Sequence, residues 1–505
     1  MNTHKIFGPP GTGKTTRLIG IVESLLDQGT PPEKVCFISF TRKAAGEAKE
    51  RAMDKFDLPE ERLPYFKTIH ALCYKQIGVT RDAVMGFGDY IELATLMGYN
   101  LTFKKINEDG SFATYTKGDR VFFLENLKRI LLTSFRDVLS AFPNDDIFEH
   151  ELLYVHETFR NYKKINGKLD YTDMLETFVA TNPSPDIQYL IVDEAQDLSP
   201  VQWQIIGLLG AKAEKTYIAG DDDQAIYKWA GADVDTFIDM DATVETLPQS
   251  YRLPKRVQDV AVKLVSGLPH RQDKVFRPHH ADGQVNYIAR IEELDLDQGQ
   301  WLLLARNVYL LDKYVTHCLS QGFSFWSRSG SQVRPGVLNS VKAWEELRAG
   351  KRLPVGEVRG IYDLMNIKHS LRYGSKKLLR TSLAKEKLGI ENLQKDYGLL
   401  TTAVWHEALG KLTPLEKEYF KTARRRGEKL LDKPRIQINT IHGVKGGEAD
   451  NVVLMQDMAG RTYMEYLKDP HNEARVWYVG VTRAKKNLHI LAPQSNNYYP
   501  LEQYL

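Results

Sequence analysis

The chain has 505 residues, which is too long for one ordinary domain and indicates about three compact units. Hydrophobic residues make up 42% and charged residues 26%, a balance that excludes a disordered or fibrous protein. The net charge is only +3, from 68 Lys and Arg against 65 Asp and Glu. That value excludes a uniformly basic nucleic-acid coat but leaves room for a local basic surface.

Neither membrane insertion nor a disulfide framework is expected. No run of 18 apolar residues occurs, so we expect no membrane-spanning helix and no membrane partner. The first residues, Met1 to Lys5, do not form the apolar core of a secretion signal. Cys36, Cys73 and Cys318 are odd in number and far apart, which argues against disulfides and against a zinc site. We therefore expect a protein of a reducing compartment, the cytoplasm.

A glycine-rich loop lies close to the first residue. Residues 8–15 read GPPGTGKT and fit the phosphate-binding pattern G-x-x-x-x-G-K-[ST], between a predicted strand at 4–7 and a predicted amphipathic helix. Backbone N–H groups of such a loop wrap phosphate oxygens, Lys14 would reach the β- and γ-phosphates, and the Thr15 hydroxyl would ligate Mg²⁺. The predicted nucleotide-binding residues here are Gly8, Pro9, Pro10, Gly11, Thr12, Gly13, Lys14, Thr15 and Thr16.

A pair of carboxylates follows a second apolar run. Leu190 to Val192 is predicted as a buried parallel strand because it is continuously apolar. Asp193, at its carboxyl end, is placed to hold Mg²⁺, and Glu194 is the predicted general base for an attacking water. Lys14 and Asp193 are 179 positions apart, which predicts an inserted segment between the two halves of the nucleotide site.

A polar and aromatic segment follows the predicted strand at 216–219. Gln224 can bond the γ-phosphate or the attacking water. Tyr227 and Trp229, three and five residues later, can stack on nucleobases. Packing of these two rings in the core is the alternative that the spacing leaves open.

These segments and several others, in their order along the chain, resemble the motifs of UvrD/Rep/PcrA-type superfamily 1 DNA helicases, in a compact bacterial or phage form. The resemblance implies an α/β fold of two RecA-like P-loop cores with parallel sheets, each interrupted by a mainly helical insertion. The matching segments are FTRKAAGE (40–47), TIH (68–70), DYTDML (170–175), DEAQD (193–197), GDDDQAIYKWAGA (220–232), QSYR (249–252), TIHGVKGGE (440–448) and VWYVGVTRA (476–484).

The resemblance also implies roles for further residues. Arg252 and Arg483 match two arginines that reach the γ-phosphate, which completes a catalytic set with Lys14, Asp193, Glu194 and Gln224. Tyr251 matches a residue that stacks on adenine, and Glu448 matches a carboxylate close to the nucleotide sugar. The positions that match DNA contacts are Phe40, Thr41, His70, Tyr227, Trp229, Thr440 and His442. Ala230 stands where the family often has an arginine.

The implied domain layout separates a basic insertion from the rest of the chain. The ranges are 1–80 and 155–248 for the first core, 81–154 for its insertion, 249–330 and 431–505 for the second core, and 331–430 for its insertion. Residues 331–430 hold 21 Lys and Arg against 11 Asp and Glu, and the remaining residues hold 47 against 54. We expect this insertion to grip duplex DNA through Arg424, Arg425 and Arg426, with a solvated helix face as the alternative.

The sequence thus predicts an ATP- and Mg²⁺-dependent DNA helicase. By family resemblance it translocates 3′ to 5′ on single-stranded DNA, unwinds duplex, binds single-strand/duplex junctions and acts as a monomer in the cytoplasm of a bacterial or phage-infected cell. Two alternatives stay open. A P-loop nucleotide or small-molecule kinase would leave Arg483 unexplained. A DNA-stimulated ATPase could displace or load proteins with little unwinding.

Overall fold

The structure, a computed structural model, describes residues 2–39, 42–102, 116–142, 146–330, 333–334, 336–381, 387–430 and 432–505. Contacts divide the chain into two compact units. The first unit consists of Met1–Asp282 with Asp469–Thr482, and the second of Gly283–Lys468 with Arg483–Leu505. Phe40 and Thr41, two of the predicted DNA-binding residues, lie outside the described residues.

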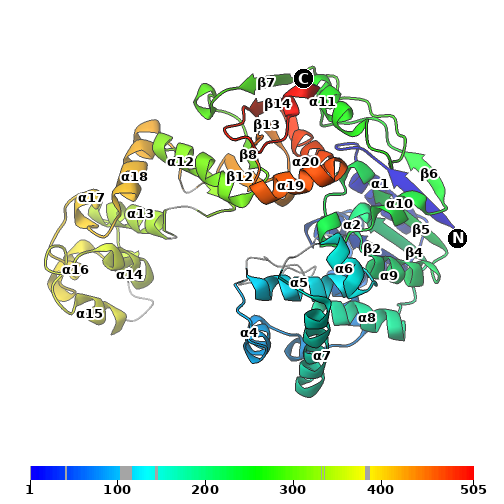
Figure 1. The fold of residues 1–505 in the computed structure, drawn as a ribbon. Helices are drawn as coiled ribbons and strands as arrows, with labels where there is room; N and C mark the ends of the chain where they lie inside the picture. Colours follow the sequence, from blue (N-terminus) through cyan, green and yellow to red (C-terminus); the bar gives the residue numbers. More distant parts are fainter. Residues whose placement is uncertain are drawn as a thin grey trace. The chain divides into compact units, whose positions relative to one another are not determined.

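The first unit is built on a six-stranded sheet in the order β3-β2-β4-β5-β1-β6, with all neighbouring strands parallel (Figure 1). The strands are β1 (Thr3–Phe7), β2 (Val35–Ser39), β3 (Phe66–Lys67), β4 (Tyr189–Asp193), β5 (Lys215–Gly220) and β6 (Thr243–Thr246). The inner strands are buried almost throughout, as expected where a parallel sheet is covered on both faces.

Helices connect and cover these strands. They are α1 (Lys14–Asp27), α2 (Arg42–Phe56), α3 (Ile69–Gln76), α8 (Tyr171–Thr181), α9 (Pro200–Gly210), α10 (Val234–Asp239), α11 (Lys255–Val265) and α20 (Pro470–Val481). The inserted segment adds α4 (Phe87–Leu96), α5 (Lys117–Ile130), α6 (Phe135–Ala141) and α7 (Glu149–Asn166). Helix α1 buries Leu18, Ile19, Val22 and Leu25, the face that its sequence spacing predicts.

The second unit repeats this architecture. Its sheet has the order β7-β14-β13-β8-β12-β9, again with parallel neighbours. The strands are β7 (Gln284–Ile288), β8 (Trp301–Ala305), β9 (Phe325–Ser327), β12 (Ile436–Thr440), β13 (Ala449–Met455) and β14 (Ala484–Leu491), accompanied by α12 (Leu311–Gln321) and α19 (Gly460–Lys468). The structure confirms the predicted fold class of two parallel α/β cores, each interrupted by a mainly helical segment.

The insertion of the second unit is helical apart from one short antiparallel pair, β10 (Leu353–Pro354) with β11 (Lys387–Leu388). Its helices are α13 (Val337–Arg348), α14 (Val355–Leu364), α15 (Ser375–Thr381), α16 (Ile390–Asp396), α17 (Trp405–Ala408) and α18 (Pro414–Arg426). None of the helices in the described part of the chain combines the length and apolarity needed to cross a lipid bilayer.

The boundary between the units differs from the expected one. The sequence analysis assigned residues 249–282 to the second core, whereas contacts group them with the first unit. Backbone and side-chain bonds explain this: Tyr251 N donates to Gly11 O at 2.8 Å, and Lys274 is buried among the carboxylates of 221–223. The predicted domain ranges themselves remain a proposal.

The DYTDML segment joins the first insertion to its core. Asp170 begins α8 as an N-cap, accepting from Asp173 N at 2.7 Å. The same carboxylate accepts from Arg129 of α5 at 2.6 Å and from Lys163 of α7 at 2.7 Å. Burial opposes the charge of Asp170, but the two cations hold the pKa of its carboxyl below the usual range. This motif is therefore a junction between three helices.

Candidate nucleotide and DNA site

The phosphate loop lies between β1 and α1, at the carboxyl end of the first sheet. Gly13 has φ 82° and immediately precedes α1, so the loop ends in a left-handed turn that favours glycine. Lys14 is buried and its Nζ donates to Gly8 O at 2.6 Å. Thr12 Oγ1 donates to Pro9 O at 2.8 Å. These bonds close the loop around the start of the helix, where N–H groups favour an anion.

Thr15 and Asp193 meet across this edge of the sheet. Thr15 Oγ1 donates to Asp193 Oδ2 at 2.8 Å. Burial first, and then the neighbouring Glu194, raises the pKa of Asp193 to about 6, while Thr15 and Lys14 oppose the shift. A hydroxyl and a carboxylate are oxygen donors of the kind that Mg²⁺ takes beside nucleotide phosphates. The two residues therefore fit the predicted metal role.

Glu194 is held in an unusual backbone conformation. Its φ is 55°, in the left-handed region that few non-glycine residues adopt. Its N–H donates to Asp193 Oδ1 at 2.9 Å, and its Oε2 accepts from Gln196 Nε2 at 2.5 Å. Strained residues of this kind persist where the surrounding structure fixes them. The carboxylate predicted as general base is thus oriented by Gln196, a residue to which the sequence analysis gave no role.

A polar chain continues from Gln196 to Gln224. Gln196 Oε1 accepts from Asp221 N at 3.0 Å, and Asp221 Oδ2 accepts from Gln224 Nε2 at 2.7 Å. All three side chains are buried. The structure therefore brings together Glu194 and Gln224, which stand 30 positions apart, through two intermediate residues. A side-chain network this dry specifies one arrangement of its members.

The segment Ser250–Arg252 lies against the phosphate loop. Ser250 Oγ donates to Pro10 O at 2.9 Å, and Tyr251 N donates to Gly11 O at 2.8 Å. Gly11 has φ 73°, and a Cβ there would collide with Arg252 Cβ, so glycine is required for this approach. Tyr251 is 73% exposed, which leaves its ring accessible for stacking. Tyr251 and Arg252 therefore lie beside the loop, and their roles toward adenine and the γ-phosphate stay predictions.

The second unit holds the other predicted nucleotide residues. Arg483 is only 2% exposed, and its Nη1 donates to Gly447 O at 3.3 Å. Glu448 is paired with Lys485 at 3.3 Å. Thr440, at the end of β12, is buried, and its Oγ1 accepts from Gly443 N at 3.1 Å, which fixes the turn that carries His442. Motifs that are far apart in sequence thus meet at one end of the second sheet.

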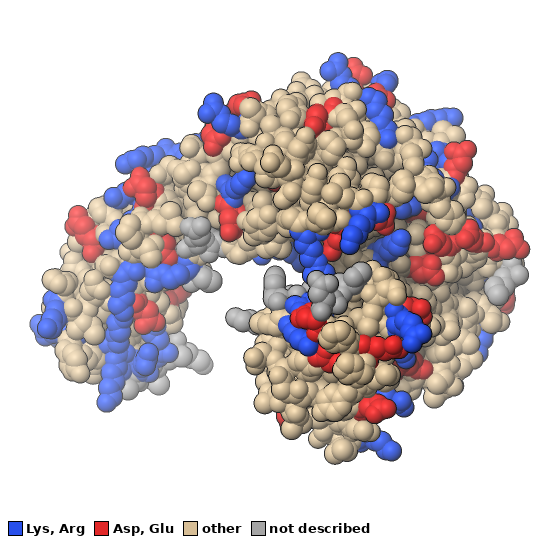
Figure 2. Space-filling model, viewed as in Figure 1, with Lys and Arg blue, Asp and Glu red and all other residues tan. Residues whose placement is uncertain are grey.

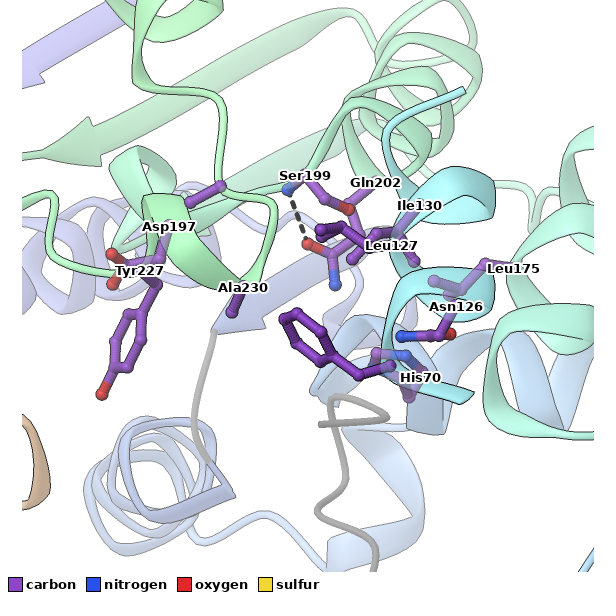
Figure 3. A pocket seen from close by; sticks show the side chains of 12 residues that line it. His70, Asn126, Leu127, Ile130, Leu175, Asp197, Ser199, Gln202, Tyr227 and Ala230 are labelled. Carbon is purple, nitrogen blue, oxygen red and sulfur yellow. Dashed lines mark hydrogen bonds between the residues drawn. The ribbon is translucent and has the colours of Figure 1, made fainter. Parts of the chain in front are cut away.

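A pocket in the first unit is lined by two of the predicted DNA residues, His70 and Tyr227. Its lining comes from α3, α5, α8, α9 and the loop after β5: His70, Phe123, Asn126, Leu127, Ile130, Leu175, Asp197, Ser199, Gln202, Tyr227, Ala230 and Ala232 (Figure 3). His70 and Asn126 lie at one end of the pocket and Tyr227 at the other. The short side chain of Ala230 contributes to this wall, where an arginine would fill space.

Aromatic rings from the insertion and from α8 lie beside two of the predicted DNA residues. Trp229 is 40% exposed and lies nearly parallel to Phe123, with centroids 6.4 Å apart and planes at 24°. His70 makes an edge contact with Tyr171 at 6.1 Å. Phe123 comes from α5, which belongs to the first insertion. No site residue was predicted in that insertion. No spacing signal marked Phe123, because its approach to Trp229 depends on how α5 packs on the core.

Comparisons with known proteins agree with this geometry. Sequence profiles match residues 1–245 as the UvrD/REP helicase N-terminal domain and residues 382–495 as the UvrD-like helicase C-terminal domain. The chain is 25% identical over 308 residues to the ATP-dependent DNA helicase PcrA of Staphylococcus aureus strain Mu50, covering 57% of this chain and 42% of that protein. It is also 25% identical over 356 residues to PcrA of Leuconostoc citreum, covering 67% and 46%.

The chain thus spans less than half the length of these two relatives. Among solved structures, the arterivirus nonstructural protein 10 helicase aligns with a TM-score of 0.35 and 11% identity, covering 100% of this chain and 62% of that one. That likeness is too low to carry an argument. The two sequence profiles together cover more than half of the chain and agree with the motif order. The chain therefore belongs to the UvrD/Rep/PcrA-like superfamily 1 helicases.

Proposed function

We propose that this protein is an ATP-dependent DNA helicase that translocates 3′ to 5′ on single-stranded DNA and separates duplex. One observation carries the proposal. The loop after β5 holds Gln224, which is hydrogen-bonded toward Glu194, and three to five residues later it holds Tyr227 and Trp229 beside an aromatic-lined pocket. A short loop that is buried at Gln224 and partly exposed at Trp229 can transmit a change at the nucleotide to the DNA.

Each nucleotide-site residue has a chemical task in this proposal. Lys14 and the loop N–H groups bind the phosphates, and Glu194 accepts a proton from the attacking water. Gln224 orients that water or the γ-phosphate, and Arg252 stabilises the charge that develops on the phosphoryl oxygens. When bound through Thr15 and Asp193, Mg²⁺ would neutralise charge on the β- and γ-phosphates.

In the second unit the assignments rest on motif positions. Arg483 is assigned to the γ-phosphate, Glu448 to the nucleotide sugar, and Thr440 and His442 to DNA. A buried arginine at the end of a helix-to-strand turn is a preorganised cation, since it loses little side-chain freedom when it meets a phosphate. A conformational change on ATP binding, reversed after hydrolysis, would move the DNA strand.

The basic insertion is proposed to hold duplex DNA, and one of the residues first expected to do so has contacts within its own unit. Arg426 donates to Asp297 at 2.5 and 2.9 Å, and its guanidinium lies 3.9 Å from the Phe323 ring centroid. These contacts anchor α18 within its own unit. Arg426 is therefore held within its own unit, whereas Arg424 and Arg425 are exposed, so the expected duplex contact through 424–426 stays a proposal.

A second proposed phosphate-binding group consists of Lys376, Arg380 and Lys411. Burial lowers the pKa of Lys376, and Lys411 and Arg380 lower it further, with Asp363 opposing them. Cations that crowd each other in this way are stabilised by an added anion such as a phosphate. Figure 2 shows Lys and Arg side chains gathered on the lobe where Figure 1 places α14, α15 and α16.

The setting follows from the proposed activity. ATP and single-stranded DNA are its substrates, tailed duplexes are the expected junction substrate, and the motor is expected to act as a monomer. The relatives are bacterial helicases. We accordingly place the protein in the cytoplasm of a bacterial or phage-infected cell, where DNA replication and repair expose single strands.

The test is ATP hydrolysis with and without single-stranded DNA, combined with strand displacement on 3′- and 5′-tailed duplexes. The proposal predicts DNA-stimulated hydrolysis and displacement of the 3′-tailed substrate. Hydrolysis that DNA does not stimulate would overturn it. Stimulated hydrolysis without displacement would instead support a motor that strips or loads proteins, and displacement restricted to 5′ tails would reverse the polarity.

A further inference from the structure

Three consecutive carboxylates are buried around one lysine. Lys274 Nζ lies 3.1 Å from Asp221 Oδ1 and 2.9 Å from Asp223 Oδ2, and it also pairs with Asp222. The Lys274 side chain is 1% exposed and the three Asp side chains are no more exposed than that. Because ions in a dry site are costly unless they are paired, this lysine holds together a loop that would otherwise repel itself.

Other bonds complete the cluster and fix its surroundings. Arg271 Nε and Nη2 both donate to Asp223, at 2.9 and 2.6 Å. Gln272 N donates to Asp222 Oδ2 at 2.8 Å. From α20, Arg475 donates to Asp222 O at 3.1 Å. The cluster therefore ties the loop after β5 to the 270–274 segment and to a helix of the last family motif.

Asp221 connects the cluster to the predicted catalytic residues. Asp221 accepts from Lys274 through Oδ1 and from Gln224 Nε2 through Oδ2, at 2.7 Å. Its own N–H donates to Gln196 Oε1 at 3.0 Å, and Gln196 Nε2 reaches Glu194 at 2.5 Å. Asp221 is thus the point from which both Gln224 and, through Gln196, Glu194 are oriented.

We propose that Lys274 is a positioning residue for ATP hydrolysis, which holds Asp221 so that the Gln224 amide and the Glu194 carboxylate stay aligned for the attacking water. This role rests on the proposed assignment of Glu194 and Gln224. Lys274 does not contact the nucleotide in this proposal. It acts through Asp221, and small displacements of such groups reduce turnover strongly without changing how ATP is bound.

Arg271 provides a matched control. It is a cation of the same cluster, drawn from the same segment, but the hydrogen bonds it donates both go to the Asp223 carboxylate, whereas Asp223 reaches Asp221 through its backbone N–H at 3.3 Å. Loss of either cation should lower stability. Only loss of Lys274 should misalign Gln224.

The experiment compares the wild type, Lys274→Met, the charge-balanced double variant Lys274→Met/Asp222→Asn, and Arg271→Gln. For each we would measure kcat and KM for ATP without DNA, together with the melting temperature. The expected result is that the double variant melts within a few degrees of the wild type while kcat falls at least tenfold and KM changes less than threefold. Arg271→Gln should keep kcat within about twofold.

Three outcomes would overturn the positioning role. They are a well-folded double variant with wild-type kcat, an equal loss of kcat in Arg271→Gln, and a double variant that no longer melts cooperatively, since Lys274 would then be needed for the fold itself. These measurements are made without DNA, so they do not depend on the helicase proposal. If DNA did not stimulate ATP hydrolysis by the wild type, the helicase proposal would be overturned, but the comparison of the variants would stay valid.

Discussion

Thr15 and Asp193 share a 2.8 Å hydrogen bond although 178 positions separate them. The first lies at the start of α1 and the second at the end of β4, so the bond joins the two halves of the nucleotide site at one edge of a parallel sheet. In open α/β sheets, ligands bind outside the carboxyl ends of the strands. Substitutions of the other predicted site residues can test whether they act together with this pair.

Removing the central charges should abolish turnover. We expect Lys14→Ala and Glu194→Gln each to reduce ATP hydrolysis at least about 100-fold, because one removes the phosphate-binding cation and the other the general base. Glu194→Gln should still bind ATP, since the amide keeps the size of the side chain. Steady-state hydrolysis and fluorescent-nucleotide binding measure the two effects. Asp186→Asn, at an exposed carboxylate, serves as the control; activity within tenfold in both site variants would mean the site is misplaced.

Phe123 should contribute to binding of single-stranded DNA. Its ring lies beside Trp229, and one base–aromatic stack is worth about 1–3 kcal/mol, so Phe123→Ala should weaken affinity roughly 5- to 100-fold. Fluorescence anisotropy with a labelled oligonucleotide measures this. Phe148→Ala changes another aromatic of the same insertion that is exposed and does not line the pocket. Equal affinities for the two variants would remove Phe123 from the DNA site.

Neutralising the Lys376, Arg380 and Lys411 group should weaken binding to duplex and flatten its salt dependence. Each phosphate contact contributes about 0.9 to the slope of log affinity against log salt, so a triple alanine variant should lose about 2–3 from that slope. The control is Lys342→Ala/Lys351→Ala, two lysines of the same insertion that both neighbour Glu346. If the slope of log affinity against log salt did not change, the three cations would not contact duplex DNA and would be ordinary solvated side chains.

The junction at Arg129 should matter for stability of the first unit. Arg129 is buried and donates to Asp170, Asp173 and Glu176 at 2.5 to 3.1 Å. Its replacement by Ala would leave Asp170 and Asp173 with Lys163 as their cation, and breaking a buried ion cluster in this way costs about 3–5 kcal/mol. Arg136→Ala, on exposed α6, should change stability by less than about 0.5 kcal/mol. Calorimetric unfolding distinguishes them, and a similar transition temperature for both would contradict the junction role.

The second unit should lose stability in mild acid through His489. Burial lowers the pKa of His489 to about 4, against an ordinary value of 6.5. Its contribution is therefore fully present above pH 6.5 and is lost as the pH falls toward 4, because the unfolded chain binds the proton first. Between pH 7 and pH 5 we expect a loss of about 1–2 kcal/mol. In urea titrations, His489→Gln should show a smaller loss over this range; an equal loss would place the acid sensitivity elsewhere.

The strands and the phosphate loop were readable because their signals are local. Leu190 to Val192 is continuously apolar and forms part of β4, and Leu18, Ile19, Val22 and Leu25 form the buried face of α1 as their spacing predicts. The grouping of residues 249–282 by contacts could not be predicted from local signals. Residues 249–282 join the first unit through Tyr251 and Lys274, whose partners are more than 50 positions away.

What the sequence determined by itself was which chemical groups each motif offers: a lysine and a hydroxyl in a glycine-rich loop, adjacent carboxylates after an apolar strand, and a glutamine followed by aromatic rings. What only the tertiary structure decided was which side chains support them. Gln196 bonds to Glu194, Asp221 bonds to Gln224 and Lys274, Phe123 lies beside Trp229, and Arg426 packs on Phe323. The reason is physical. Periodicity and turn chemistry act over a few residues, whereas burial of a charge depends on partners that packing brings from distant parts of the chain.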